Sequence, residues 1–202
     1  MPLHRDIEAF EQRAQKYERG LLGRLHKEII KRSTELVLTS GPEPRRVLDV
    51  GTGTGFLLRE LARLCPDASE LVGVDPAQQM TEVATAQTND PRVSYLAGVG
   101  AEHLPFEDGA FDVITAVTSF DHWADQRLGL FECHRVLAPG GRFVLVDLFN
   151  VCFYPTLLLT HRGKARTKRR ATRLLRRCGF QTIEWRGLYS TWMKAVVTTR
   201  GD

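Results

Sequence analysis

Short apolar runs alternate with stretches of helical periodicity along most of this chain. Runs such as Val144-Leu145-Val146 are continuously apolar, which is typical of strands buried on both faces of a parallel sheet. We expect strands over 46–50, 71–75, 92–96, 111–117, 142–148, 181–186 and 190–199. We expect helices over 5–38, broken near Gly20 and Gly23, and over 56–65, 76–88, 128–137 and 165–178. This alternation indicates an α/β fold with a parallel sheet covered by helices.

A glycine-rich turn, Gly51-Thr52-Gly53-Thr54-Gly55, joins the first expected strand to a helix. Glycines let a backbone turn tightly and approach a ligand closely, and a helix start offers amide donors. Asp75 ends the next strand, which in a doubly wound sheet lies beside that turn. A carboxylate there can accept hydrogen bonds from both hydroxyls of a ribose. The alternative is a tight turn and a strand-end aspartate without any ligand.

The glycine spacing distinguishes between two cofactor classes. The nicotinamide fingerprint G-x-G-x-x-G would need a glycine at position 56, where this chain has Phe56. Residues 47–55 instead resemble the first motif of the class I S-adenosylmethionine-dependent methyltransferases. Later blocks follow in the family's order, at Gly73–Pro76 with Met80, at 101–106 with 111–114, and at 135–141. The resemblance covers about residues 10–200 and is strongest to the branch of ubiquinone and menaquinone methyltransferases.

The resemblance implies a doubly wound, Rossmann-like, seven-stranded mixed sheet with helices on both faces and an antiparallel last strand. It implies a single domain over residues 1–202. Within it, residues 1–40 would form an N-terminal helical cap, and residues 41–150 the cofactor-binding core. Residues 151–202 would supply an acceptor-side lid, a basic helix and the last strands.

The resemblance also implies which residues hold S-adenosylmethionine. Asp49 and Gly51 would face its methionine part, Gly53 would give the backbone room, and Asp75 would hold the ribose hydroxyls. The other expected contacts are Thr52 and Gly55 in the loop, Pro76 and Met80 beside the adenine, the amide of Ala101 at the adenine edge, Glu102, and Thr118 at the methionyl amino group.

The chain departs from the family's pattern at several positions. Gly100 stands where the family often has an aspartate for the adenine amino group, and Glu102 is the candidate to replace it. Thr52 replaces a frequent cysteine. A glycine-rich asparagine motif common in quinone methyltransferases is absent after residues 111–117, which argues against a quinone acceptor.

Methyl transfer requires a positioned acceptor and, for some acceptors, a base. His122 follows the strand at 111–117, where a base should lie, and histidine accepts protons near neutral pH. Asp121 could orient His122 or act itself, and His122 could instead be only a pocket wall. Tyr17 is the second candidate, because related enzymes close an aromatic N-terminal helix over the cofactor. A packing role for Tyr17 is the alternative.

Charge is unevenly distributed over this chain of net charge +4. Residues 148–183 hold nine Lys or Arg and no acid, mostly on the expected basic helix at 162–177. This helix is either a solvated face or a contact surface for anionic headgroups or an acidic substrate. The sequence carries no RNA-binding signature, and no aromatic residues alternate with the basic ones on this helix. We therefore expect no nucleic-acid partner.

Cysteine usage and the N-terminal sequence favour a cytoplasmic protein, peripheral to a membrane if the basic helix binds one. The four cysteines form no C-x-x-C pair, so we expect reduced thiols and no metal site. The first twenty residues lack the apolar run of a signal peptide.

We therefore expect a methyltransferase acting on an oxygen, carbon or nitrogen of a small, hydrophobic molecule. The alternatives are a phospholipid-headgroup N-methyltransferase and a non-enzymatic protein that binds the cofactor or a partner.

Overall fold

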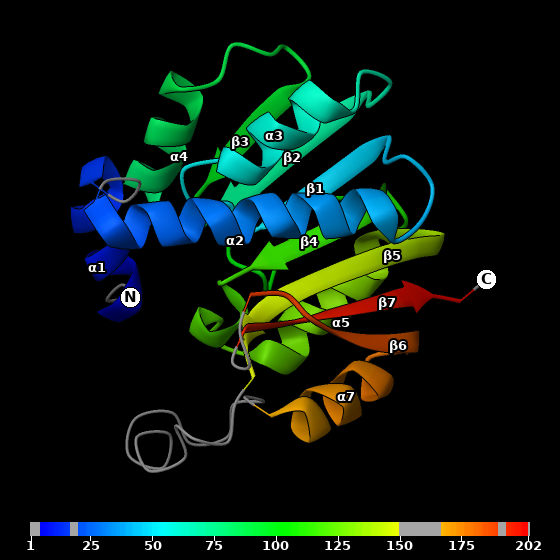
Figure 1. Ribbon diagram of the computed structural model, residues 1–202. Helices are drawn as coiled ribbons and strands as arrows, with labels where there is room; N and C mark the ends of the chain where they lie inside the picture. Colours follow the sequence, from blue (N-terminus) through cyan, green and yellow to red (C-terminus); the bar gives the residue numbers. More distant parts are fainter. Residues whose placement is uncertain (1–4, 17–19, 150–166, 190–192, 202) are drawn as a thin grey trace.

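The computed structural model describes residues 5–16, 20–149, 167–189 and 193–201, which build a seven-stranded mixed sheet (Figure 1). The strands are β1 (Arg46–Val50), β2 (Glu70–Asp75), β3 (Val93–Ala97), β4 (Phe111–Val117), β5 (Leu137–Leu148), β6 (Phe180–Gly187) and β7 (Met193–Arg200). Their order is β3-β2-β1-β4-β5-β7-β6. β7 runs antiparallel to β5 and β6, and the other pairs are parallel, so the expected sheet is confirmed.

Helices cover both faces of this sheet. They are α1 (Arg5–Arg13), α2 (Gly20–Thr39), α3 (Phe56–Leu64), α4 (Gln78–Ala86), α5 (Gln126–Val136) and α7 (Lys168–Arg177), with short 3-10 turns η1 (Ala14–Lys16) and η2 (Phe120–His122). One core cluster packs α2 and α3 against the sheet, and a second packs α5 and α7 against the opposite face (Figure 1). The expected helices on both faces are confirmed.

The central strands show why apolar runs are needed here. In β5, Phe143 and Leu145 belong to the cluster with α5 and α7, whereas Val144 and Val146 belong to the cluster with α2 and α3. All four side chains are fully buried. Since alternate residues of a strand face opposite sides, a strand covered on both faces must be apolar throughout.

The larger differences from the sequence-based expectation concern β5 and α2. β5 begins at Leu137 rather than at residue 142, because buried Leu137 pairs with Phe111 before a bulge shifts the register. In the N-terminal region, α2 begins at Gly20, whose φ is +72°, and then continues through Gly23 without a break. A glycine inside a helix is tolerated at a cost of about 1 kcal/mol.

The structure describes only the second half of the expected basic helix at 162–177, from residue 167 onward. Its helix α7 begins after Thr167, whose side chain accepts a hydrogen bond from the Arg170 amide. The expected acceptor-side lid at 151–159 and the basic residues before 167 lie outside the described residues. None of the helices that the structure describes has the length and apolar character needed to span a membrane.

The strand order reverses direction between β1 and β4, which lie side by side although β2 and β3 come between them in sequence. In open α/β sheets, ligands bind outside the carboxyl ends of the strands at such a switch point. The glycine turn follows β1, and Thr118 follows β4, so both segments meet at this crevice.

Candidate functional site

A cavity of about 310 Å³ opens at the carboxyl ends of β1, β2 and β4. It lies at the switch point of the sheet, where ligand sites are expected in this architecture. Its walls are formed by Ile7, Phe10, His26, Ile30, Asp49, Val50, Gly51, Thr52, Gly53, Asp75, Pro76, Met80, Val99, Gly100, Ala101, Glu102, Val117, Thr118, Ser119, His122, Trp123 and Ala124.

The glycine turn is shaped by close backbone contacts. Gly51 has φ +76°, and a Cβ there would collide with the Ser119 side chain. Ser119 is itself held, because its hydroxyl donates to the Val50 carbonyl at 2.7 Å. Gly53 has φ +55°, and a Cβ built on it would meet no atom within 4 Å. Gly51 is therefore required by packing, whereas Gly53 leaves open space for a ligand beside its backbone.

Asp75 at the end of β2 presents a buried carboxylate to the cavity. Its Oδ2 accepts from the Gly53 amide at 2.8 Å, and its Oδ1 accepts from the Ala77 amide at 2.9 Å. Burial raises the pKa of Asp75 to about 6, against the lowering effect of these two hydrogen bonds. Each carboxylate oxygen has two acceptor positions, so the group retains acceptor capacity toward the cavity.

Asp49 forms a second buried carboxylate in the same cavity. Its Oδ1 accepts from the Thr115 hydroxyl at 2.7 Å. Burial raises the pKa of Asp49 to about 6, and the hydrogen bond from Thr115 partly offsets this. Thr52, which the sequence also indicates, is buried in the wall beside Asp49 and Asp75. Burying a charged carboxylate costs free energy, and two such carboxylates, Asp49 and Asp75, in one cavity are typical of a ligand site.

Residues 99–102 form one part of the cavity wall. Within it, the Glu102 carboxylate lies in the space that the missing side chain of Gly100 leaves open. A Cβ at position 100 would lie 2.7 Å from Glu102 Oε2. The other oxygen, Glu102 Oε1, accepts from the Asp125 amide at 3.0 Å. The Glu102 carboxylate therefore occupies the space in which a side chain at position 100 would begin. Ala101 lies between them and is buried in the same wall.

Thr118 has an unusual backbone conformation at the end of β4. It is the one described non-glycine residue with positive φ, at +54°. Left-handed backbone is costly for a β-branched residue and is worth attention where it occurs at a site. Its amide still donates to the Val146 carbonyl at 2.8 Å, so the turn begins directly where the sheet ends.

His122 lies at the cavity on the turn η2 and packs edge-on against Phe10 of α1, with ring centroids 5.0 Å apart. Trp123, the next residue, is buried and also lines the cavity. Asp121 does not line the cavity; its amide donates to Asp147 Oδ2 at 3.1 Å. The structure thus places His122, but not Asp121, in the cavity wall.

The remaining expected residues divide into three groups. Pro76, Met80, Ala101 and Thr118 line the cavity with the residues already described. Gly55 does not: it is the capping residue before α3, with φ +74°, and a Cβ there would collide with the Tyr95 hydroxyl, so this glycine serves packing. Tyr17 lies outside the described residues.

Sequence reasoning missed the contribution of the N-terminal helices. His26, for which a surface position is the simpler reading of the sequence, lines the cavity together with Ile30 of α2. Ile7 and Phe10 of α1 line it as well. The only local signal is spacing, since residues three or four apart share a helix face. Nothing in that spacing tells which site the face covers.

Comparisons with known proteins agree with this geometry. Residues 48–145 match the family model described as a methyltransferase domain. The chain is 41% identical over 118 residues to a demethylmenaquinone methyltransferase of Thermotoga maritima, covering 58% of this chain and 49% of that protein. It is 33% identical over 174 residues to a malonyl-[acyl-carrier protein] O-methyltransferase of Geobacter sulfurreducens, covering 79% and 64%.

Among solved structures, the fold is similar to a methyltransferase in complex with the Trm112 methyltransferase activator of Haloferax volcanii. The TM-score is 0.82 at 22% identity, covering 96% of this chain and 98% of that one. This likeness concerns the fold. The chain spans about half the length of the demethylmenaquinone methyltransferases that it matches.

Proposed function

Since this chain belongs to the class I S-adenosylmethionine-dependent methyltransferases, in the branch of the ubiquinone and menaquinone enzymes, we propose that it methylates a small hydrophobic molecule. The methylated atom is an oxygen, carbon or nitrogen. One observation carries the proposal: a single cavity joins the Asp75 carboxylate and the glycine turn to apolar side chains and to His122.

The donor and acceptor groups of the cavity fit S-adenosylmethionine, which supplies an activated methyl group on its sulfonium. Asp75 would accept from the two ribose hydroxyls, using the acceptor positions that Gly53 and Ala77 leave free. The open space beside Gly53 lets the cofactor lie against the backbone. Asp49, Gly51 and Thr118 would face its methionine part.

The wall at 99–102 would recognise the adenine. The Ala101 amide would donate to a ring nitrogen, and Glu102 Oε2 would accept from the exocyclic amino group. In support, that carboxylate occupies the space beside Gly100 and its other oxygen is held by the Asp125 amide. Pro76 and Met80, from the other side of the cavity, would pack against the ring.

The apolar part of the cavity wall is suited to a hydrophobic acceptor. Ile7, Phe10, Ile30 and Trp123 line it. Burial of apolar area gives about 25 cal/mol per Å², so such walls favour an apolar ring or chain over a highly polar substrate. Some relatives are named for a demethylmenaquinone and another for a malonyl-[acyl-carrier protein], and both belong in an acceptor panel.

His122 is the base that we propose for acceptors that must lose a proton. It lies in the cavity wall and its ring is oriented by the edge contact with Phe10. A positioned base contributes about 10²–10⁴-fold to turnover. An amine acceptor would attack without such a base.

The test combines binding and turnover. Calorimetry should show tight binding of S-adenosylhomocysteine and none of NAD, and Asp75→Ala should weaken that binding by about 1.5–3 kcal/mol. With an accepted substrate, His122→Ala should lower turnover by about 10²–10⁴-fold at unchanged cofactor affinity. His103→Ala is the matched control, because His103 is exposed and lies outside the cavity. Cofactor binding without turnover on any acceptor would favour the non-enzymatic alternative.

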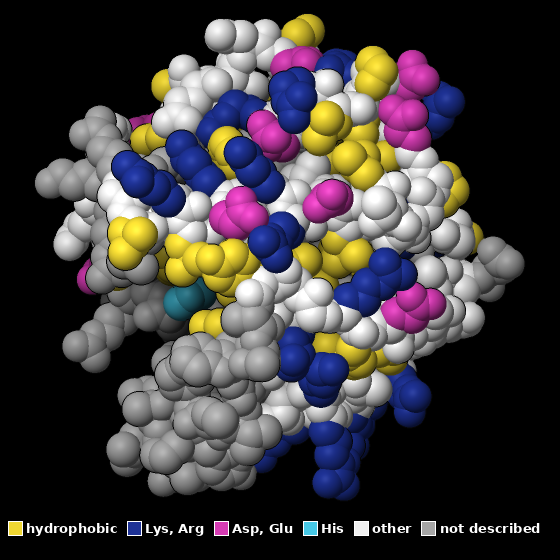
Figure 2. Space-filling view, viewed as in Figure 1, with side chains coloured by type: hydrophobic (Ala, Val, Ile, Leu, Met, Phe, Trp, Pro, Cys, Tyr) yellow, Lys and Arg dark blue, Asp and Glu magenta, His cyan; other side chains and the backbone are white. Residues whose placement is uncertain are grey.

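We also propose that α7 contacts an anionic partner, namely phospholipid headgroups or an acidic substrate. Six exposed Lys or Arg side chains lie on this helix, and none forms an ion pair with a described residue. In Figure 2, blue side chains gather along the lower edge of the molecule, where Figure 1 places α7 in the same view. Like charges so close together repel one another, and an anion bound there would relieve this repulsion.

A further inference from the structure

The loop between β3 and β4, residues 98–110, contains the proposed adenine wall but no helix or strand of its own. Irregular segments are ordinarily less rigid than the elements they connect. At its start, the Val99 amide donates to the Asp75 carbonyl at 3.3 Å. Most of the other polar contacts that hold the loop come from one helix, α5, and its capping residue.

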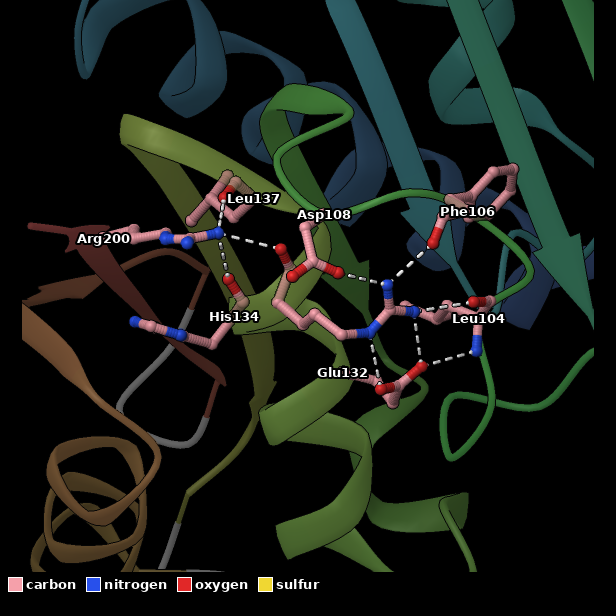
Figure 3. Close-up of polar contacts among 8 residues, drawn as sticks. Leu104, Phe106, Asp108, Glu132, His134, Leu137 and Arg200 are labelled. Carbon is pink, nitrogen blue, oxygen red and sulfur yellow. Dashed lines mark hydrogen bonds and ion pairs between the residues drawn. The ribbon is translucent and has the colours of Figure 1, made fainter. Parts of the chain in front are cut away.

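Arg135, in the last turn of α5, is the centre of these contacts, and Figure 3 labels its partners Leu104, Phe106, Asp108 and Glu132. Its Nη2 donates to the Leu104 carbonyl at 2.9 Å, and its Nη1 donates to the Phe106 carbonyl at 2.7 Å. Nη1 also meets Asp108 Oδ1 at 2.9 Å. One planar guanidinium thus spans three positions of the loop, which a lysine ammonium could not do in the same geometry.

Glu132, one turn earlier, fixes that guanidinium and bonds the loop itself. Its two oxygens accept from Arg135 Nε and Nη2, both at 2.8 Å, in a bidentate pair. Glu132 Oε2 also accepts from the Leu104 amide at 3.0 Å. Both backbone polar groups of the buried Leu104 are therefore bonded by this pair. The guanidinium holds the pKa of Glu132 below its usual range, so the carboxylate stays ionised.

The same helix holds the wall at its other end. Asp125, the N-terminal capping residue of α5, donates its amide to Glu102 Oε1 at 3.0 Å. The proposed adenine wall is thus bonded to Asp125 at the start of α5. The residues directly after the wall are bonded to Glu132 and Arg135 towards the end of α5. Asp125 therefore holds Glu102 directly, whereas Glu132 and Arg135 hold the residues that follow it, beginning at Leu104.

We propose that Glu132 and Arg135 are positioning residues that set the selectivity of the site for adenine. They touch neither the cofactor nor the acceptor, and they act by holding the 99–102 wall where the Ala101 amide and the Glu102 carboxylate meet the base edge. This inference rests on the proposed function, in which S-adenosylmethionine occupies the cavity. If this pair only stabilised the fold, replacing it would weaken the binding of all cofactor analogues equally.

The test measures binding of two probes, S-adenosylhomocysteine and its deaminated analogue S-inosylhomocysteine. The analogue carries a carbonyl where adenine has an amino group, and this oxygen would face the Glu102 carboxylate. We expect the wild type to prefer the adenine form by at least about tenfold, as lost hydrogen bonds to a charged acceptor imply. Glu102→Ala should reduce this preference.

Arg135→Lys and Glu132→Gln should reduce the preference to about threefold or less while the protein remains folded. Glu132→Gln is the milder change, because the amide oxygen can still accept from the Leu104 amide. The matched control is Arg200→Gln. Arg200 Nη1 donates to the carbonyls of His134, Arg135 and Leu137 at the end of α5 and does not touch the loop (Figure 3).

Arg200→Gln should lower the melting temperature yet keep the wild-type preference. The inference is overturned if Arg135→Lys and Glu132→Gln keep that preference, or if Arg200→Gln loses it as fully as they do. A wild type that binds both probes equally well would refute the adenine role of Glu102, and with it this inference. Binding of neither probe would refute the proposed function itself.

Discussion

At the scale of single residues, the site is built from groups that are unfavourable for the fold. Asp49 and Asp75 are both buried, and the pKa of each is raised to about 6. Thr118 adopts left-handed backbone at the same cavity. Such features persist where the surrounding structure over-determines them, and they cluster at ligand sites. The presence of these unfavourable groups in one cavity lowers the local stability of the fold and is consistent with a ligand site.

Replacing Asp49 by Asn should stabilise the protein without its cofactor at pH 8. The raised folded pKa means that the native state binds a proton more readily than the unfolded state, whose pKa is near 3.8. The contribution of this group to stability is therefore complete below pH 3.8 and is lost as pH rises through about 6. Asn keeps the acceptor for Thr115 and carries no charge, so the melting temperature at pH 8 should rise by about 2–4 °C per kcal/mol gained.

Thermal unfolding from pH 8 to pH 4 checks this. The advantage of Asp49→Asn should shrink as the pH falls below 6, whereas S-adenosylhomocysteine binding at pH 8 should be weaker than in the wild type. Asp67→Asn is the control, because Asp67 is exposed. An Asp49→Asn protein that melts below the wild type at pH 8 would contradict the explanation.

At the scale of elements, the site depends on how helices are attached to one another. α1 supplies Ile7 and Phe10 to the cavity, packs them against the apolar cluster that contains Met80 and Val83 of α4, and makes a polar attachment to α4 as well. Glu11 accepts from the Gln78 amide at 2.8 Å and the Gln79 amide at 2.7 Å. This carboxylate satisfies two free N–H groups at the start of α4, whose own capping residue Ala77 has no side chain to do so.

Glu11→Ala should therefore loosen α1 and speed the release of S-adenosylhomocysteine. Loss of a charge-assisted hydrogen bond of about 1.5 kcal/mol corresponds to roughly tenfold in the dissociation rate. Stopped-flow displacement measures this rate. Glu8→Ala removes the same charge from an exposed position of α1, and its rate should equal that of the wild type. Equal rates in Glu11→Ala and the wild type would show that α1 does not retain the ligand.

The charge of α7 is an element-scale property as well. Exposed charges are screened beyond about 8 Å at physiological salt, so any binding they drive should weaken steeply as salt rises. Each basic residue near an anionic bilayer contributes about 1 kcal/mol. The wild type should cosediment with acidic liposomes at low salt and not with neutral ones. Replacing Arg169, Arg170 and Arg173 by Gln should abolish this and leave cofactor affinity unchanged.

Failure of the wild type to bind acidic liposomes at low salt would exclude the headgroup proposal. Normal turnover by the triple variant would then exclude the acidic-substrate proposal too, and α7 would be a solvated face.

At the scale of the whole molecule, stability should be greatest in the middle of the sheet. β1, β4 and β5 are paired on both sides and covered on both faces, whereas β3 and β6 are edge strands with mostly exposed or half-buried residues. Local opening is least costly where burial is least.

Native-state hydrogen exchange should therefore be slowest in β1, β4 and β5 and fastest, among the strands, in β3 and β6. Mass spectrometry of the exchanged peptides measures this order. Slow exchange throughout β3 would contradict it, because an unpaired edge has no second strand to protect its amides.

The sequence by itself determined the order of elements, the parallel part of the sheet and the place of the glycine turn. Apolar runs mark strands buried on both faces, and the glycines and Asp75 follow strands whose carboxyl ends must meet at one edge. These are local patterns whose spatial meaning is set by backbone geometry. They were sufficient to place Gly51, Gly53, Asp75 and His122 around one cavity, and the family resemblance added Asp49.

Only the tertiary structure decided which distant side chains complete that cavity. Phe10 and His26 reach it because α1 and α2 pack across the strand ends, and no sequence spacing links those helices to β4. Gly55, although part of the glycine motif, packs against Tyr95 instead of facing the cavity. The attachment of the 98–110 loop to Arg135 joins residues about thirty positions apart. Such contacts depend on how whole elements pack, and periodicity along the chain carries no information about that packing.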